Sequence, residues 1–161
     1  MRAGRTLVLA VLAAAVLAVS ASAPAAPKPL SRAAFDTRVQ AIGRQYQHDV
    51  STLSVKSSGS SSAAKEAAMA SEFERVYRHL AARLGLLIPP KEIAADYKVM
   101  VASFRDEVGY AAAWRDAALH GTAQEAAKAS MRLDFNPAIT RAQAAAARIT
   151  AKGYDLGVFS A

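Results

Sequence analysis

The stretch Lys91–His120, KEIAADYKVMVASFRDEVGYAAAWRDAALH, decides the fold because it carries the longest amphipathic pattern in the chain. Its apolar residues recur at steps of three and four, which places their side chains on one face of an α-helix. We therefore expect one helix over Lys91–Leu119, roughly 43 Å long at about 1.5 Å rise per residue. The apolar stripe consists of Ile93, Tyr97, Met100, Phe104, Val108, Ala111, Trp114 and Ala118.

Two amphipathic segments precede this stretch. A first helix is expected to begin after Ser31, a suitable N-cap, and a second to run over about Ala63–Leu84, with Gly85 as its C-terminal cap. Between them, residues 56–62 (KSSGSSS) have the composition of a flexible linker, expected to be the most mobile part of the domain. The apolar run at 86–88 (LLI) is expected to plug one end of the molecule.

The segment after the long helix starts with a strong local signal. Gly121 is followed by the capping-box pattern Thr122-Ala123-Gln124-Glu125, which predicts the start of a fourth helix. Pro137 interrupts that helix, which predicts either a kink or a restart with Asn136 as the cap. The apolar tail over 154–159 is expected to fold back against the core.

Together these segments predict an all-α protein. Alanine is abundant, and no window shows the strict alternation of a half-buried strand. Four amphipathic segments joined by short turns favour an antiparallel up-down four-helix bundle, with a kinked or split fourth helix and an apolar C-terminal tail.

The N-terminal region has the pattern of a secretory signal peptide. Arg2 and Arg5 precede the apolar run Leu7–Val19, and the small-residue stretch 20–23 follows. A spanning helix would need roughly 20 apolar residues, so this run is too short for a stable membrane span. We expect a protein that is secreted or held at the cell-envelope exterior.

This pattern also divides the chain. Residues 1–23 are the expected signal peptide, residues 24–29 a Pro/Ala tether and residues 30–161 one helical domain. Cleavage after Ala23 competes with cleavage after Ala21 or near Ala25, because proline follows Ala23.

Composition excludes several classes of site. The chain has no cysteine, so disulfides, thiolate metal sites and cysteine nucleophiles are absent. Removing Arg2 and Arg5 from the 20 basic residues leaves 18 against 13 acidic ones, a mildly basic balance. These charges are spread along the chain rather than gathered on one face, so no nucleic-acid partner is expected. Weak attraction to an anionic envelope polymer is the alternative reading.

Catalytic and metal-binding patterns are also missing from the sequence. The three histidines, His48, His79 and His120, fall on different helices, and none belongs to a Glu-x-x-His pair. Asp116 and His120 are four apart, which favours a pair at a helix end over a metal site. No nucleophile elbow or phosphate loop occurs. We expect no enzyme, no metal and no cofactor.

Three stretches carry a resemblance to known proteins: LSRAAFDTRVQAIGRQY at 30–46, LLIPPKEIAADYKVMV at 86–101 and GYDLGVFSA at 153–161. Their order resembles that in small exported all-helical proteins of unknown function from high-GC Gram-positive bacteria. In those proteins two cysteines stand where this chain has Gly43 and either Phe159 or Ser160. The resemblance implies that Gly43 faces the tail, with Phe159 in the place of the disulfide. An ordinary helix glycine facing a neighbouring helix would explain Gly43 equally well.

Two functional hypotheses remain. The first is an exported, non-catalytic helical domain that acts through its surface on an unknown protein or envelope polymer. The second is a carrier of a small hydrophobic ligand, with a cavity at the bundle end lined by Leu87, Phe104 and Trp114. Tyr77 and Tyr110 fall outside the main stripes and are expected to mark a groove. A cavity with convergent polar groups would favour the carrier.

Overall fold

The computed structural model describes residues 28–56 and 62–160. The predicted signal peptide, most of the predicted tether and residues 57–61 of the predicted linker lie outside the described residues. The described part is all-α and contains no strand, which confirms the predicted fold class. Its elements are α1 (Arg32–Lys56), α2 (Ala63–Gly85), the 3₁₀ turn η1 (Lys91–Ile93), α3 (Ala94–His120), α4 (Ala123–Asp134), α5 (Pro137–Ala151) and the 3₁₀ turn η2 (Gly157–Phe159).

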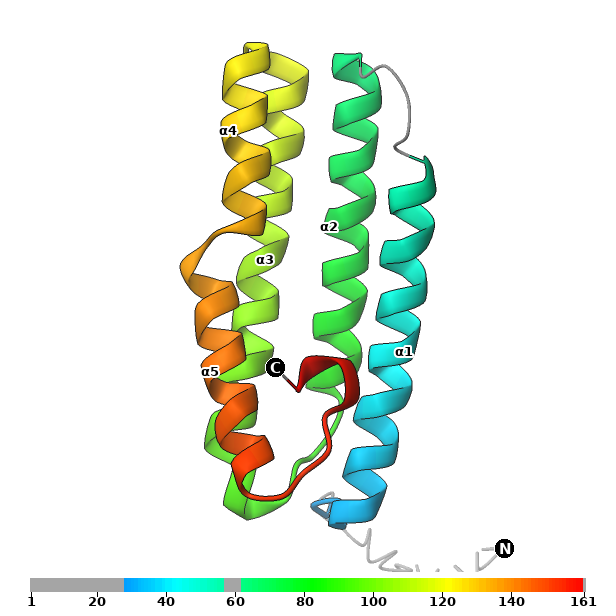
Figure 1. Ribbon diagram of the computed structural model, residues 1–161, viewed down its shortest axis with the longest axis vertical. Coiled ribbons are helices and arrows are strands. Elements are labelled where there is room, and N and C mark those ends of the chain that lie inside the picture. Colours follow the sequence, from blue (N-terminus) through cyan, green and yellow to red (C-terminus); the bar gives the residue numbers. More distant parts are fainter. Residues whose placement is uncertain (1–27, 57–61, 161) are drawn as a thin grey trace, which may run out of the picture.

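Helix α3 is the central element of the arrangement. It packs against α2 along one side and against α4 and α5 along another, and α1 packs against α2. Figure 1 shows α4 and α5 following one another along α3, while the red C-terminal segment crosses from the end of α5 to α1. The tail therefore folds back on the helices, as its apolar residues predict.

The sequence signals for the starts of α1 and α4 are found at their predicted positions. The Ser31 hydroxyl accepts a 3.3 Å hydrogen bond from the Ala34 amide at the start of α1. At the start of α4, the Thr122 amide donates to Glu125 Oε2 at 2.7 Å and the Glu125 amide donates to Thr122 Oγ1 at 3.2 Å. The predicted capping box is therefore confirmed.

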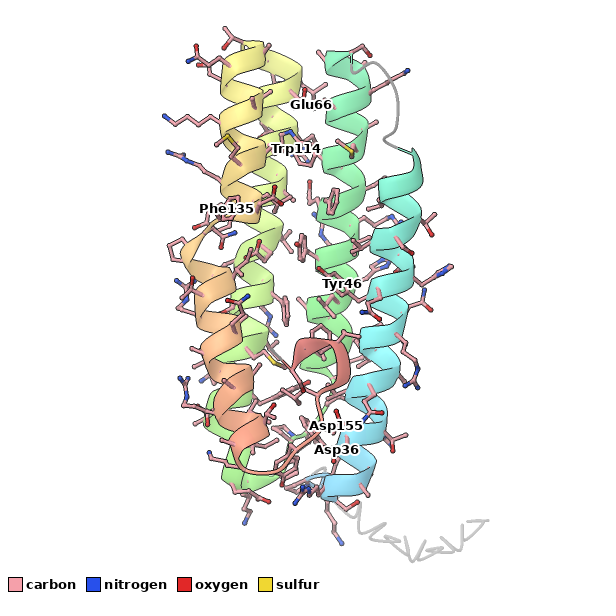
Figure 2. The ribbon with its side chains drawn as sticks, viewed as in Figure 1. Asp36, Tyr46, Glu66, Trp114, Phe135 and Asp155 are labelled. Carbon is pink, nitrogen blue, oxygen red and sulfur yellow. The ribbon has the colours of Figure 1, made fainter. Side chains whose placement is uncertain are left out.

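The junction between α4 and α5 depends on Asn136. Its side-chain oxygen accepts hydrogen bonds from the Ala138 amide at 2.8 Å and the Ile139 amide at 3.2 Å, and Pro137 occupies the first turn of α5. Proline is well suited to that position because its missing N–H would have no partner inside the helix. The chain between the helices leaves Phe135 84% exposed (Figure 2).

Two clusters of side chains make up most of the core. The larger one is centred on Phe35, whose ring meets those of Tyr97 and Tyr154 edge-on at 5.1 and 5.8 Å. The smaller one surrounds Trp114, whose indole N–H donates a 3.0 Å hydrogen bond to Glu66 on α2 (Figure 2). The stripe of the long helix thus contributes to both clusters.

Three predictions at the chain reversals are wrong. Leu86 is 82% exposed, so the run at 86–88 does not bury all its side chains. Gly85 is the last residue of α2, and Leu86 rather than Gly85 is the C-cap. The α-helix α3 begins at Ala94, because the prolines before it are followed by a 3₁₀ turn in which the Ile93 amide donates to the Pro90 carbonyl at 3.2 Å. No helix in the described ranges has both the length and the apolar character needed to cross a bilayer.

The tail makes a close approach to Gly43 on α1. A Cβ atom on Gly43 would lie 2.8 Å from Val158 Cγ2 and 3.2 Å from Phe159 Cε2. Gly153 has φ of +85°, a conformation that favours glycine, and it turns the chain out of α5 towards α1. The expected contact between Gly43 and the tail is therefore confirmed, and it explains why a glycine stands inside α1 despite a cost of about 1 kcal/mol relative to alanine.

Candidate ligand-binding cavity

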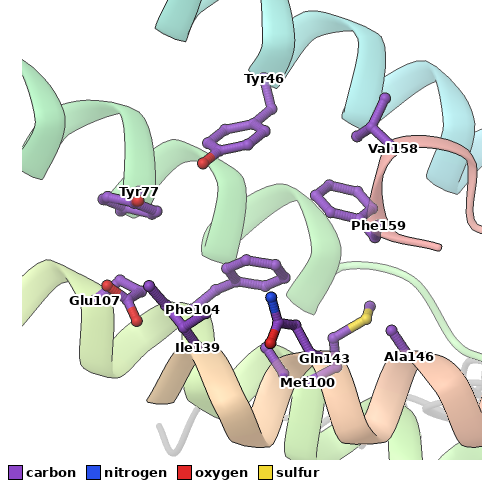
Figure 3. A pocket seen from close by; sticks show the side chains of 11 residues that line it. Tyr46, Tyr77, Met100, Phe104, Glu107, Ile139, Gln143, Ala146, Val158 and Phe159 are labelled. Atoms are coloured by element: carbon purple, nitrogen blue, oxygen red, sulfur yellow. The ribbon is translucent and has the colours of Figure 1, made fainter. Parts of the chain in front are cut away.

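A half-open cavity of about 290 Å³ lies between α1, α2, α3, α5 and the tail (Figure 3). The Val158 and Phe159 side chains form its wall at the tail, so the segment that closes on Gly43 also shapes the cavity. A cavity of roughly 150 Å³ is enough to hold benzene, so this one has room for a bicyclic hydrocarbon. Its lining residues are Tyr46, Tyr77, Met100, Phe104, Glu107, Ile139, Ala142, Gln143, Ala146, Val158 and Phe159.

Aromatic rings cover much of the cavity wall. The ring centroids of Tyr46 and Tyr77 are 6.1 Å apart, those of Tyr46 and Phe159 are also 6.1 Å apart, and those of Phe104 and Phe159 are 5.4 Å apart. The rings come from α1, α2, α3 and the tail, so they converge only when all four segments are assembled (Figure 3). Flat apolar walls of this kind are typical of sites for small organic molecules.

One carboxyl group lies among these rings. Glu107 follows Phe104 by three residues on α3, which places both on the same face of the helix. Glu107 is 2% exposed and lines the cavity. Its Oε2 accepts a 3.1 Å hydrogen bond from Asn136 Nδ2, whereas its Oε1 has no hydrogen-bond partner within the described part of the chain. Buried carboxylate oxygens are normally paired, so this oxygen calls for an explanation.

The environment of Glu107 disfavours the ionised form of its carboxyl group. Burial raises the pKa of this carboxyl above its usual value, and the neighbouring Asp106 carboxylate raises it further. The hydrogen bond from Asn136 and the positive charge of Arg141 act in the opposite direction. Arg141 is engaged at the surface, where it binds Asp106 at 2.7 Å. Glu107 therefore lacks a directly bonded cation among the described residues.

Two phenol groups and the Gln143 amide complete the polar lining. Burial raises the pKa of the Tyr46 and Tyr77 hydroxyls above the usual 10.0. Both phenols are therefore neutral at physiological pH. None of the lining side chains is basic, and Glu107 is the one lining residue with a carboxyl group.

The three residues predicted to line a cavity lie at different levels of the molecule. Phe104 lines the cavity described above. Leu87 packs at the edge of the larger core cluster, and Trp114 is buried in the smaller one. Trp114 is ten residues beyond Phe104, about 15 Å along α3 at 1.5 Å per residue, so the two cannot border one small cavity. Tyr46, on the cavity wall, lies midway along α1 rather than at its end (Figure 2).

Of the cavity residues, Tyr77 was predicted from its position in the sequence and Glu107 was not. Tyr77 was expected to mark a groove because it falls outside the main stripe, and it does line the cavity, whereas Tyr110 packs against the Trp114 cluster. Glu107 is spaced three residues from Phe104 and four from Ala111, which puts an acid on the apolar face of α3. An acid on the apolar face of a helix is therefore the sequence feature that could have identified Glu107.

The other acids and histidines considered from the sequence lie elsewhere. Asp116 binds Arg115 at 2.9 Å, and His120 is the last residue of α3. Glu74, a second buried acid, is paired with both Arg78 and Arg115. Among the described residues, no three His, Cys, Asp or Glu side chains gather closely enough to hold a metal ion.

Comparisons of the chain with family models, with curated proteins and with solved structures find no match.

Proposed function

We propose that this protein is an exported, non-catalytic carrier that holds a small, largely apolar ligand in the cavity beside Glu107. The observation that carries the proposal is the buried, unpartnered Oε1 of Glu107 on the wall of an aromatic cavity. Burying a carboxyl oxygen without a hydrogen-bond partner costs free energy, and a ligand with a hydrogen-bond donor would offset that cost. Between the two hypotheses that the sequence raises, this favours the carrier.

The proposed architecture is an antiparallel up-down bundle in which α4 and α5 together form a split fourth helix. The packing of α3 against α2, α4 and α5 supports this arrangement, as does the new N-cap at Asn136. In this arrangement the split brings Asn136 to Glu107, and the tail occupies the space between α1 and α5. The carrier site would then be a consequence of the interruption at Pro137.

Export is part of the proposal and rests on the N-terminal sequence. The basic residues, the 13-residue apolar run Leu7–Val19 and the small residues after it support a cleaved signal peptide. Mass spectrometry of the protein collected outside its own cells tests this. A mature N-terminus at Ser22, Pro24 or Ala26 supports export, whereas an intact N-terminus on cell-internal protein contradicts it.

The resemblance to small exported helical proteins also remains a proposal. The close contact of Val158 and Phe159 with Gly43 supports it, because the resemblance implies that this contact replaces a disulfide. Placing cysteine at Gly43 and Phe159 tests the idea. Spontaneous oxidation to one cross-linked species without loss of helicity supports the equivalence, and failure to cross-link contradicts it.

The carrier function is tested by titrating the purified protein with 2-naphthylmethanol, a fluorescent probe of suitable size. We expect one site with a dissociation constant on the order of 10–100 μM, given the binding free energy available to a ligand of about a dozen heavy atoms. Ala142→Leu, which fills the cavity from α5, should weaken binding. Ala144→Leu adds the same side chain to the exposed face of α5 and is the matched control.

The titration has three distinct outcomes. Loss of binding in Ala142→Leu, with wild-type affinity in Ala144→Leu, supports a site in the cavity. Equal binding by all three proteins contradicts the site, and absence of binding to wild-type protein contradicts the carrier function. Thermal melts of each variant establish that the comparison is made on folded protein.

Action through the surface on a protein or envelope polymer is the second candidate. The observation that favours it is the exposure of Phe135 and Met131, at 84% and 64%, beside one another at the end of α4. Substituting both by serine should abolish partner capture if this surface binds, and should leave the titration of the cavity unchanged.

A further inference from the structure

The cavity wall has a distinctive combination of charge and surface. It presents one buried carboxyl and four aromatic rings, and it contains no basic side chain. An anionic ligand such as a fatty acid would meet Glu107 without a cation to pair with. A neutral hydrocarbon would leave Glu107 Oε1 unpaired, which is costly inside the protein.

A protonated amine supplies both the positive charge and the hydrogen-bond donor that Glu107 Oε1 lacks. Its N–H groups donate to a carboxylate in a charge-assisted hydrogen bond, which is stronger than one between neutral groups. Cations are also attracted to the faces of tyrosine and phenylalanine rings, more so when water is excluded. The Asn136 amide already holds Oε2 at 3.1 Å, so one oxygen of the carboxylate is fixed while the buried Oε1 is left without a partner.

We infer that the ligand is a small lipophilic amine whose charged nitrogen binds Glu107 Oε1 and whose hydrocarbon body lies against Tyr77 and Phe104. This assignment of a ligand class rests on the proposed carrier function. The size of the cavity, about 290 Å³, limits the hydrocarbon body to one or two fused rings or an equivalent chain.

The test compares two probes of nearly the same shape, 2-naphthylmethylamine and 2-naphthylmethanol, at neutral pH. Wild-type protein is expected to bind the amine at least ~10-fold more tightly than the alcohol, the ratio that one additional charge-assisted contact supplies. Glu107→Gln should weaken amine binding by ~10-fold or more and change alcohol binding by less than ~3-fold.

Glu72→Gln is the matched control. It removes one negative charge from α2, at an acid that is 47% exposed and paired with Arg75, and it leaves the cavity intact. Amine affinity should therefore remain at the wild-type value. Circular dichroism and Trp114 emission report whether each variant is folded, and the comparison of the two probes on wild-type protein does not depend on any variant.

The outcomes separate this inference from the carrier function. Tighter amine binding that is lost only in Glu107→Gln supports the inference. Alcohol binding equal to or tighter than amine binding overturns the inference and leaves the carrier function standing. Tighter amine binding that survives in Glu107→Gln also overturns it, because the charge would then be recognised elsewhere. Absence of binding by both probes contradicts the inference and the carrier function together.

Discussion

The side chain of Asn136 connects the start of α5 to Glu107 in the middle of α3. Its oxygen caps the helix through the Ala138 and Ile139 amides, while its Nδ2 donates to Glu107 Oε2 at 3.1 Å and to the Leu133 carbonyl at 2.9 Å. One buried residue therefore terminates α4, starts α5 and orients the carboxyl group of the cavity.

Replacing Asn136 should lower the free energy of unfolding. Part of the loss should come from the helix cap and part from the hydrogen bonds that its amide donates. Asn136→Ala loses the cap and leaves two acceptors without a donor, so we expect a loss of about 2–4 kcal/mol in the free energy of unfolding. Asn136→Ser retains a capping oxygen and loses the amide donor, so its loss should be roughly half as large. Urea denaturation followed by Trp114 emission measures both. Losses below about 0.5 kcal/mol in both variants would contradict this account.

Glu107→Gln is expected to stabilise the ligand-free protein at pH values where Glu107 is ionised in the folded state. The substitution retains an acceptor for Asn136 and removes a buried charge, so the gain should be about 1–2 kcal/mol. Because burial raises the pKa of Glu107 in the folded protein, the penalty for ionising it develops as the pH rises from the unfolded-state pKa through the folded-state pKa.

The pH dependence provides the check on this gain. At pH values below the unfolded-state pKa the carboxyl is protonated in both states, so the variant and wild-type protein should approach equal stability. The difference should grow as the pH rises and then remain constant above the folded-state pKa. A difference that is independent of pH would show that the carboxyl charge is not its cause.

Gly43→Ala and Gly109→Ala form a matched pair of helix substitutions. A Cβ on Gly109 meets no atom within 4 Å, so Gly109→Ala should gain about 1 kcal/mol from helix propensity alone. A Cβ on Gly43 would lie 2.8 Å from Val158 Cγ2, so the tail must move and the gain should be lost or reversed. Thermal melting compares the two variants. Equal stabilisation would mean that the tail does not pack on Gly43 in solution.

Binding of 2-naphthylmethylamine should weaken as the pH falls through the pKa of Glu107. Burial holds that pKa above the usual 4.5, Asp106 raises it further and Arg141 opposes this, so the midpoint should lie above that of an exposed glutamate. The phenols of Tyr46 and Tyr77 titrate only in the alkaline range and do not contribute. Calorimetric titration at several pH values measures the midpoint. 2-Naphthylmethanol is the control, and a matching pH dependence for the alcohol would exclude Glu107 as the cause.

Local signals in the sequence predict much of the fold. The capping box at Thr122 and Glu125 depends on residues three apart, and the stripe on α3 depends on helical spacing, so both can be identified from short windows. The exposure of Leu86 could not be identified in this way. It depends on how the chain turns between α2 and α3, because its neighbour Leu87 contacts the core and Leu86 does not.

The cavity was less accessible to sequence reasoning because it is formed by contacts between distant segments. The proximity of Asn136 to Glu107 joins positions 29 residues apart, and the wall formed by Phe159 depends on the tail crossing to α1. Phe104 was identified because it belongs to the stripe. Glu107 was not, since an acid beside Asp106 resembles an ordinary solvated pair until the position of α5 is known.

The most direct test of the account is the position of a bound probe. Nuclear Overhauser effects between 2-naphthylmethylamine and protein methyl groups locate the naphthalene ring without relying on any substitution. The account predicts contacts to Ile139 and Val158, two methyl-bearing residues of the cavity wall. Contacts to Met131 beside Phe135 instead, with none to the cavity, would contradict it.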